Sequence, residues 1–175
     1  GLGGLCRGDS NGHDYLVSIL RKEGMKTVFF ADCGVNTGGQ STLFDMIQSH
    51  PNLDFLDLDD NKLNDKDAIR LADALRHNRT LDYLSLERNE FTQLGEDVLK
   101  KVVYDDSSLN ALANSNHVCT IVGLEYAGKD FSYCEGGKKD SRRRSCARKI
   151  LHLLEERNKE GTNVKHWEIE VGEDM

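Results

Sequence analysis

The chain has 175 residues, of which 38% are hydrophobic and 30% are charged, and its formal net charge is −7 at neutral pH. This length and apolar content allow one domain with a buried core, and no apolar run approaches the ~20 residues that a membrane-spanning helix needs. The opening residues also lack the pattern of a secretory signal or transit leader, so we expect an intracellular protein, cytoplasmic first and organellar as the alternative.

Residues 1–24 begin with closely spaced glycines and continue into a helical pattern that includes Leu16, Ile19 and Leu20. We interpret this segment as the helical half of a partial first repeat, because Ile19 lies one repeat length before Ile47. A phosphate-binding loop is the alternative for the glycines, but the spacing G-x-x-x-x-G-K-[ST] is absent and no strand precedes them.

Between residues 25 and 115 an apolar pattern returns every 28 residues. Leu56 and Leu58 lie two residues apart, so a β-strand points both side chains to one face. Such an apolar wedge cannot bury itself alone, and neighbouring copies must stack against it. The central copy reads Leu53-x-x-Leu56-x-Leu58-x-x-Asn61-x-Leu63, and the copies on either side begin at Met25 and Leu81.

A helix is expected after each strand at the same step. The spacing of Leu71, Ala74 and Leu75 is that of one helical face. The N-caps predicted for two of these helices are Asn64 or Asp65, and Thr92. The predicted helices span residues 40–49, 66–77 and 94–104.

A polar column follows the strands at Cys33, Asn61 and Asn89. An asparagine at this place can bond the backbone of its own turn and of the adjacent turn, which satisfies groups that no strand pairing reaches. Cysteine can replace it as a small, weakly hydrogen-bonding residue.

This register of several columns resembles the leucine-rich-repeat family, and within it the ribonuclease-inhibitor-like class, over residues 14–119. The resemblance implies an α/β solenoid of strand–helix repeats with a parallel sheet on its concave face. A narrower resemblance is to leucine-rich-repeat proteins of diatom-like microalgae, in which similar sequence segments follow the last repeat. The segments that carry it are Ser115–Cys119 and Arg157–Val164. This group implies no particular activity. The predicted organisation is a partial first repeat at 1–24, repeats at 25–52, 53–80 and 81–108, a degenerate repeat at 109–119, and a loop, capping helix and tail at 120–175.

The C-terminal part is expected to close the repeats. The fourth copy keeps Leu109 and Leu112 and then decays, as terminal repeats do. Residues 120–137 are rich in glycine and aromatic residues and predict a loop, and a strand-like tail follows at 162–175. Between them we expect a helix to about Asn158 that lies as a lid over the end of the sheet. Its predicted apolar face consists of Ala147, Ile150, Leu151 and Leu154.

The residues between the core leucines should face the concave side of the sheet. Phe29, Phe55 and Tyr83 would lie adjacent on strands ~4.8 Å apart, and exposed aromatic residues are enriched at binding surfaces. The fourth copy would continue these columns with Ala111, Ala113 and Ser115. Residues 25–115 hold 16 acidic and 9 basic residues, so the whole net charge lies in the repeats. The predicted partner-binding residues are Phe29, Phe55, Tyr83, Asp57, Asp59, Asp60, Glu87 and Arg88.

We therefore predict a non-enzymatic protein-interaction module or assembly subunit, without a cofactor, whose partner is a protein with basic or apolar contact groups. Ordinary solvated strand positions are the plainer interpretation of the acidic residues. A calcium site at Asp32, Asp57, Asp59 and Asp60 is a sharper one, but the looped D-x-D-x-D-G pattern is absent. An open sheet also offers no pocket for a pair of catalytic carboxylates.

The main alternative is nucleic-acid or phosphate binding through the basic run 138–149. Asp140 interrupts this run, and no aromatic residues interleave it, so a solvated helix start is favoured. The residues of this alternative site are Lys138, Lys139, Arg142, Arg143 and Arg144.

The five cysteines are odd in number and irregularly spaced, which predicts reduced thiols in an intracellular compartment. Zinc sites use paired spacings such as C-x-x-C, and His117-x-Cys119 is the nearest approach to one. Both residues fall on columns of the predicted fourth repeat, so we expect buried structural roles.

Overall fold

The structure is a computed structural model that describes residues 11–22, 24–124 and 141–159, with the side chains of residues 141–145 and 159 outside the description. The N-terminal glycines, most of the predicted loop at 120–137 and the tail at 162–175 therefore lie outside the described residues. No described helix is both long enough and apolar enough to cross a membrane.

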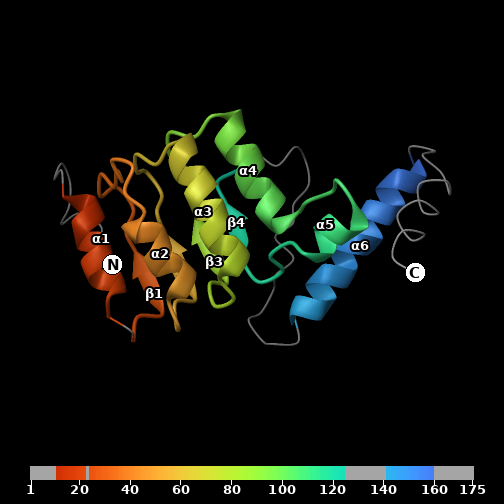
Figure 1. Ribbon diagram of the computed structural model, residues 1–175, viewed down its shortest axis with the longest axis horizontal. Helices are drawn as coiled ribbons and strands as arrows, with labels where there is room; N and C mark the ends of the chain where they lie inside the picture. Colours follow the sequence, from red (N-terminus) through yellow and green to blue (C-terminus); the bar gives the residue numbers. More distant parts are fainter. Residues whose placement is uncertain (1–10, 23, 125–140, 160–175) are drawn as a thin grey trace.

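The described chain alternates helices with short strands and is a mixed α/β fold, as predicted. Figure 1 shows α1 to α4 side by side in one layer, with the strands behind them. The elements are α1 (Gly12–Leu20), β1 (Thr27–Phe29), α2 (Thr42–Ser49), β2 (Phe55–Asp57), α3 (Asp65–His77), β3 (Tyr83–Ser85), α4 (Gln93–Val103), α5 (Leu109–Ala113), β4 (Thr120–Val122) and α6 (Ser141–Lys159).

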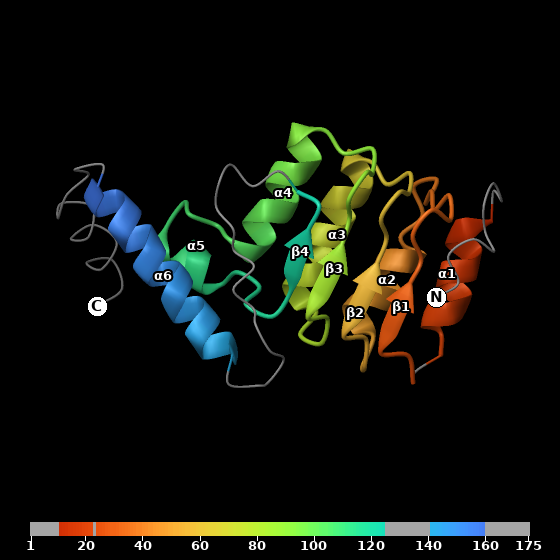
Figure 2. The ribbon, with the colours of Figure 1, turned by 180° about the vertical axis from the view of Figure 1, so that it is seen from behind.

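The strands form one parallel sheet in the order β1-β2-β3-β4. Thr27 pairs with Phe55 and Phe55 with Tyr83, so each pairing advances by the 28 residues of the sequence pattern. In Figure 2 the strands lie in front of the helices, and no described helix covers this side of the sheet. We call this side the open face.

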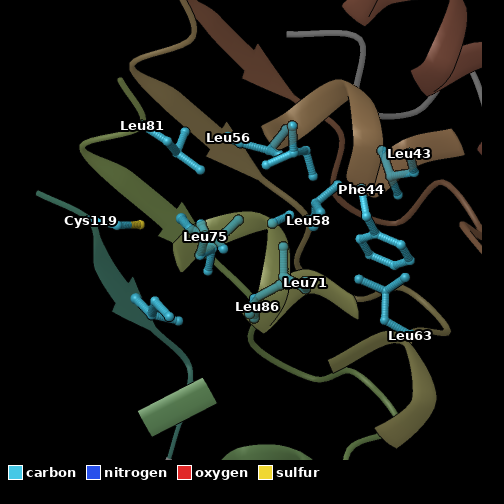
Figure 3. Packing of buried hydrophobic residues seen from close by; sticks show 14 of the residues in the cluster. Leu43, Phe44, Leu56, Leu58, Leu63, Leu71, Leu75, Leu81, Leu86 and Cys119 are labelled. Carbon is cyan, nitrogen blue, oxygen red and sulfur yellow. The ribbon is translucent and has the colours of Figure 1, made fainter. Parts of the chain in front are cut away.

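The apolar columns of the pattern make the core between the sheet and the helices. The central residues of the first three strands, Val28, Leu56 and Leu84, are buried, and so is Phe30. Figure 3 shows Leu56 and Leu58 of one strand segment pointing toward the helical residues Leu71 and Leu75. The phase predicted for the strands is therefore confirmed.

The predicted helices and two of their caps are also confirmed. The Asn64 side chain accepts a hydrogen bond from Lys66 N, and Asp67 completes a reciprocal capping box at the start of α3. The Thr92 side chain accepts from Leu94 N at the start of α4. These bonds satisfy main-chain donors that have no partner within the first helical turn.

The polar column joins adjacent turns as predicted. The buried Asn61 side chain accepts from Val35 N at 2.8 Å and donates to Phe30 O at 2.9 Å, both in the preceding turn. It also donates to Leu58 O at 3.0 Å in its own turn. Asn89 repeats the arrangement one unit later, where it accepts from Leu63 N at 3.1 Å.

The turn after each of the first three strands contains one non-glycine residue with left-handed backbone. These are Asp32, Asp60 and Arg88, with φ of 52°, 54° and 53°. Asp32 N donates to Asp59 O and Asp60 N donates to Glu87 O, so the sheet pairing continues into the turns. The left-handed region is strained for most side chains, and its recurrence at one position indicates that the three turns share one geometry.

The fourth repeat is where the prediction is wrong. Leu109 and Leu112 lie in α5 instead of a strand, and Ala111, Ala113 and Ser115 do not join the sheet face. Tyr83 pairs with Thr120, 37 residues further on, and β4 therefore falls after the predicted degenerate repeat. The insertion of α5 between α4 and β4 breaks the 28-residue step.

Asn116 marks the true approach to β4. It accepts hydrogen bonds from Val118 N and Cys119 N, just as Asn78 accepts from Thr80 N and Leu81 N before β3. Cys119 is buried, as predicted, but as a residue of this turn and not of the predicted column.

The apolar face predicted for the last helix is only partly confirmed, because Ile150 packs against apolar neighbours whereas Ala147 and Leu151 do not. Ala147 is exposed, and Leu151 is 58% exposed. Leu153 instead packs with Tyr104 and Leu112 in a second apolar cluster. The helix α6 contacts α5 and the turns beside it, so it does not lie as a lid over the sheet.

Candidate functional site

Three aromatic side chains form a continuous strip on the open face. The ring centroids of Phe29 and Phe55 are 5.0 Å apart, and those of Phe55 and Tyr83 are 4.8 Å apart with an angle of 3° between the ring planes. Phe29 is 47% exposed, and Phe55 and Tyr83 are partly exposed. The sheet positions them, because parallel register places equivalent residues of adjacent strands one strand spacing apart. We call these three residues the aromatic strip.

A row of carboxylates lies next to the strip, toward the carboxyl ends of the strands. Asp57 ends β2, and Asp59 and Glu87 follow β2 and β3. One oxygen of Asp57 accepts from Asp59 N at 3.0 Å, and one oxygen of Asp59 accepts from Glu87 N at 2.7 Å. We call Asp57, Asp59 and Glu87 the carboxylate row.

Asp60 and Arg88 form an ion pair at the edge of this row. The Nε and Nη2 groups of Arg88 donate to the two carboxylate oxygens of Asp60, the latter at 2.6 Å. These hydrogen bonds lower the pKa of Asp60 and raise that of Arg88. Both groups are well solvated, and such pairs contribute little to stability. Arg88 Nη1 also lies 3.3 Å from Glu87 Oε2, so one arginine serves two carboxylates and the site keeps an excess of negative charge.

The carboxylate row acts on the aromatic strip through its charge. Partial burial raises the pKa of the Tyr83 phenol, and the charges of Asp59, Glu87 and Asp57 raise it further. Negative charge near a phenol disfavours the phenolate. The same field favours a cation beside the ring.

The structure thus brings together the eight residues that the sequence predicts for the partner-binding surface. Six of them form the strip and the row, and Asp60 and Arg88 form the ion pair beside them, so Arg88 bonds to carboxylates of the site instead of standing apart as a contact group. Within the described part of the chain, no group of three His, Cys, Asp or Glu residues could hold a metal ion.

A hollow of about 690 Å³ at the carboxyl ends of β1 and β2 was not predicted. Asp32 and Asp60 line it from the turns, His13 and Asp14 line it from the start of α1, and Thr37 lines it from the loop after β1. Only the glycine-rich spacing of residues 34–39 hinted at a wide loop here. The hollow contributes further carboxylates at the same edge of the sheet.

The basic alternative site lies largely outside the described residues. This holds for Lys138 and Lys139 and for the side chains of Arg142, Arg143 and Arg144. The described end of the run includes Lys149, which is buried and donates to Val103 O at 2.6 Å and Asn116 O at 3.3 Å. This lysine therefore serves packing and cannot meet a phosphate.

Among the described residues, Cys33, Cys119 and Cys146 form no disulfide with one another. Cys33 is buried in the polar column, and its Sγ donates to Ala31 O at 3.3 Å. Cys6 and Cys134 lie outside the described residues.

No family model matches the sequence, and no curated protein matches it either. Among solved structures, the chain is similar to one described as "Leiomodin-1 Actin-Binding Site 2 (ABS2)", with a TM-score of 0.50 and 12% sequence identity. The alignment covers 85% of this chain and 93% of that chain. At this identity the likeness concerns the fold alone, and it agrees with the mixed α/β arrangement.

Proposed function

We propose that this chain is a non-enzymatic protein-interaction module or assembly subunit that binds a partner protein on its open face. The observation that carries the proposal is the exposed, continuous aromatic strip of Phe29, Phe55 and Tyr83. Exposed aromatic side chains at regular spacing supply a large contact area with little loss of rotational freedom.

We further propose that the fold is a leucine-rich-repeat solenoid whose open face is the concave side. The 28-residue register of β1 to β3 supports this, as do the Asn61 and Asn89 side chains that join adjacent turns. In stacked-repeat proteins each unit contacts its neighbours, and the surface built from successive units is the usual binding surface.

The leiomodin-1 chain supports the class of function. It is described as an actin-binding site, so a chain of similar fold serves protein binding there. The likeness does not select actin as the partner of this chain, and purified actin is one partner to test among others.

The decisive experiment is affinity capture with the full chain from an extract of cells that express it, read by quantitative mass spectrometry. The test variant, Phe55→Ser/Tyr83→Ser, removes two rings from the open face. The matched control, Ile69→Ser/Leu94→Ser, removes two side chains that are 50% and 60% exposed on the helical side.

We expect the control to capture the same proteins as the wild type. The ring variant should capture at least about tenfold less of them, which is the size of effect expected when an anchor residue of an interface is removed. Circular dichroism checks that both variants are folded. Equal capture by the two folded variants would exclude the open face as the binding surface.

A further inference from the structure

The open face places apolar rings and carboxylates at a fixed separation. Phe55 and Asp57 begin and end β2, so their side chains lie on the same side of the sheet, two residues apart. Two residues of a strand span roughly 6.6 Å. A side chain that rests on the rings can therefore bring its tip to the carboxylate row.

The carboxylate row retains unused acceptors. Asp57 and Asp59 each accept one main-chain hydrogen bond through Oδ1, and their Oδ2 atoms have no hydrogen-bond partner among the described residues. Asp60 differs, since Arg88 occupies both of its oxygens. The acceptors of Asp57 and Asp59 are thus available to an incoming donor.

We infer that the open face recognises arginine side chains on an apolar segment of a partner protein. The aliphatic stem of each arginine would lie on the exposed ring edges of Phe55 and Tyr83, whose faces stack on each other, and its guanidinium would donate hydrogen bonds to Asp57 and Asp59. The inference rests on the proposed function and names the chemistry of the partner's contact segment.

Arginine suits this arrangement better than lysine does. Its guanidinium is planar and rigid, and its N–H groups match the oxygens of a carboxylate. Lysine offers a compact ammonium that holds its water more strongly. The molecule already contains one such match, in which Arg88 bonds both oxygens of Asp60.

Two further features favour an arginine flanked by apolar residues. The aromatic strip extends over three strands, which is more ring surface than one arginine stem covers, and Phe29 at its end is 47% exposed. The charges of the carboxylate row also raise the pKa of the Tyr83 phenol, which indicates negative potential at the ring itself. Such a potential attracts a cation whose apolar stem lies on the rings.

Three synthetic peptides test the inference directly. They share the sequence Leu-X-Leu-X-Leu-X-Leu, in which X is arginine, lysine or citrulline, and carry a fluorescent label for anisotropy titration with the full chain. Citrulline keeps the shape of arginine without its charge. We expect the arginine peptide to bind about threefold to tenfold more tightly than the lysine peptide, and the citrulline peptide to bind more weakly than both.

Protein variants separate specific contact from general attraction to an acidic protein. Phe55→Leu/Tyr83→Leu and Phe29→Leu should reduce the affinity for all three peptides, and Asp57→Asn/Asp59→Asn should abolish the preference for arginine over lysine. Asp57→Asn/Asp59→Asn should weaken the arginine peptide by about tenfold. Asp73→Asn/Asp97→Asn, which removes two exposed acids from α3 and α4, should leave the affinity within twofold.

Equal affinity for the arginine and lysine peptides would overturn the inference, and so would a preference that survives in the folded Asp57→Asn/Asp59→Asn variant. A loss of affinity that is equal for the two double Asp→Asn variants would overturn it as well. The proposed function has its own test: it is wrong if Phe55→Ser/Tyr83→Ser captures the same proteins as the wild type.

Discussion

Lys149 of α6 donates a hydrogen bond from its Nζ to the main-chain oxygen of Val103, the last residue of α4, at 2.6 Å. The lysine is 9% exposed, and its Nζ also lies 3.3 Å from Asn116 O in the turn before β4. A buried ammonium is stable only with such partners, and the carboxyl end of a helix carries partial negative charge. This side chain therefore fastens α6 to the end of the repeated part.

Replacement of Lys149 by Met should release α6 while the repeated units stay folded. Methionine fills a similar volume but cannot donate to Val103 O, and hydrogen bonds from a charged group contribute about 1.5–3 kcal/mol. Amide hydrogen exchange should therefore accelerate in α6 and not in α2 or α3. Arg148→Met, at the exposed neighbouring position, is the matched control, and unchanged exchange in Lys149→Met would contradict this role.

His117 should make stability depend on pH in the weakly acidic range. Burial lowers the pKa of its imidazole below the ordinary value of 6.5, and the charge of Lys149 lowers it further. The folded chain thus holds this proton less tightly than the unfolded chain does. The contribution of neutral His117 to the free energy of unfolding is present above pH 6.5. It is lost as the pH falls through the lower pKa of the folded state.

Urea unfolding at pH 7.5 and 5.5 measures this contribution. Between these two values the wild type should lose more free energy of unfolding than His117→Asn, with His77→Asn on the exposed surface of α3 as the control. Lys149→Met should raise the pKa of His117 in an NMR titration. If the three proteins lose equal stability, the assigned burial of His117 is wrong.

Asn61→Leu should be among the most destabilising polar substitutions in the chain. The buried side chain makes five hydrogen bonds to main-chain groups, and leucine would remove all five at a cost of about 2–4 kcal/mol. Asn89→Leu should cost less, because Asn89 is only half-buried. Urea unfolding of both variants compares the two losses of free energy of unfolding. A larger loss for Asn89→Leu than for Asn61→Leu would contradict the prediction.

Gly123→Ala should destabilise the junction of β3 and β4. Gly123 has φ of 84°, and a Cβ placed there would lie 2.3 Å from Glu87 N. Left-handed backbone and main-chain displacement together should cost about 2–4 kcal/mol. Gly24→Ala is the control, since a Cβ at Gly24 meets no atom within 4 Å. Thermal unfolding compares the two, and similar melting temperatures would argue against the close approach.

The repeated part could be predicted because its signals are local and in phase. Leu56, Leu84 and Phe30 are buried, while Phe55 and Tyr83 reach the open face, as the two-residue alternation requires. The same register placed the aromatic strip and the carboxylate row. The bond between Arg88 and Asp60 was not predicted, because the sequence does not say which of several nearby carboxylates an arginine side chain will reach.

The prediction for the C-terminal part of the chain was wrong for two physical reasons. The 28-residue step could not reveal the insertion of α5, although Asn116-x-x-Cys119 repeats the spacing of Asn78-x-x-Leu81 and would have located β4. In α6 the apolar spacing favoured a face with Leu151, whereas Ile150 and Leu153 pack in the second cluster and Lys149 bonds to Val103 O. Lys149 is buried because its ammonium donates to two main-chain oxygens. The pattern of apolar residues in the sequence cannot predict burial of this kind.

The rings of the aromatic strip come from three successive units, although each strand pairs only with its neighbours. A partner that contacts all three rings would link three successive units from outside the fold. Its binding energy would then oppose the fraying of single units, so the occupied protein should melt in one sharp transition where the bare one melts unit by unit.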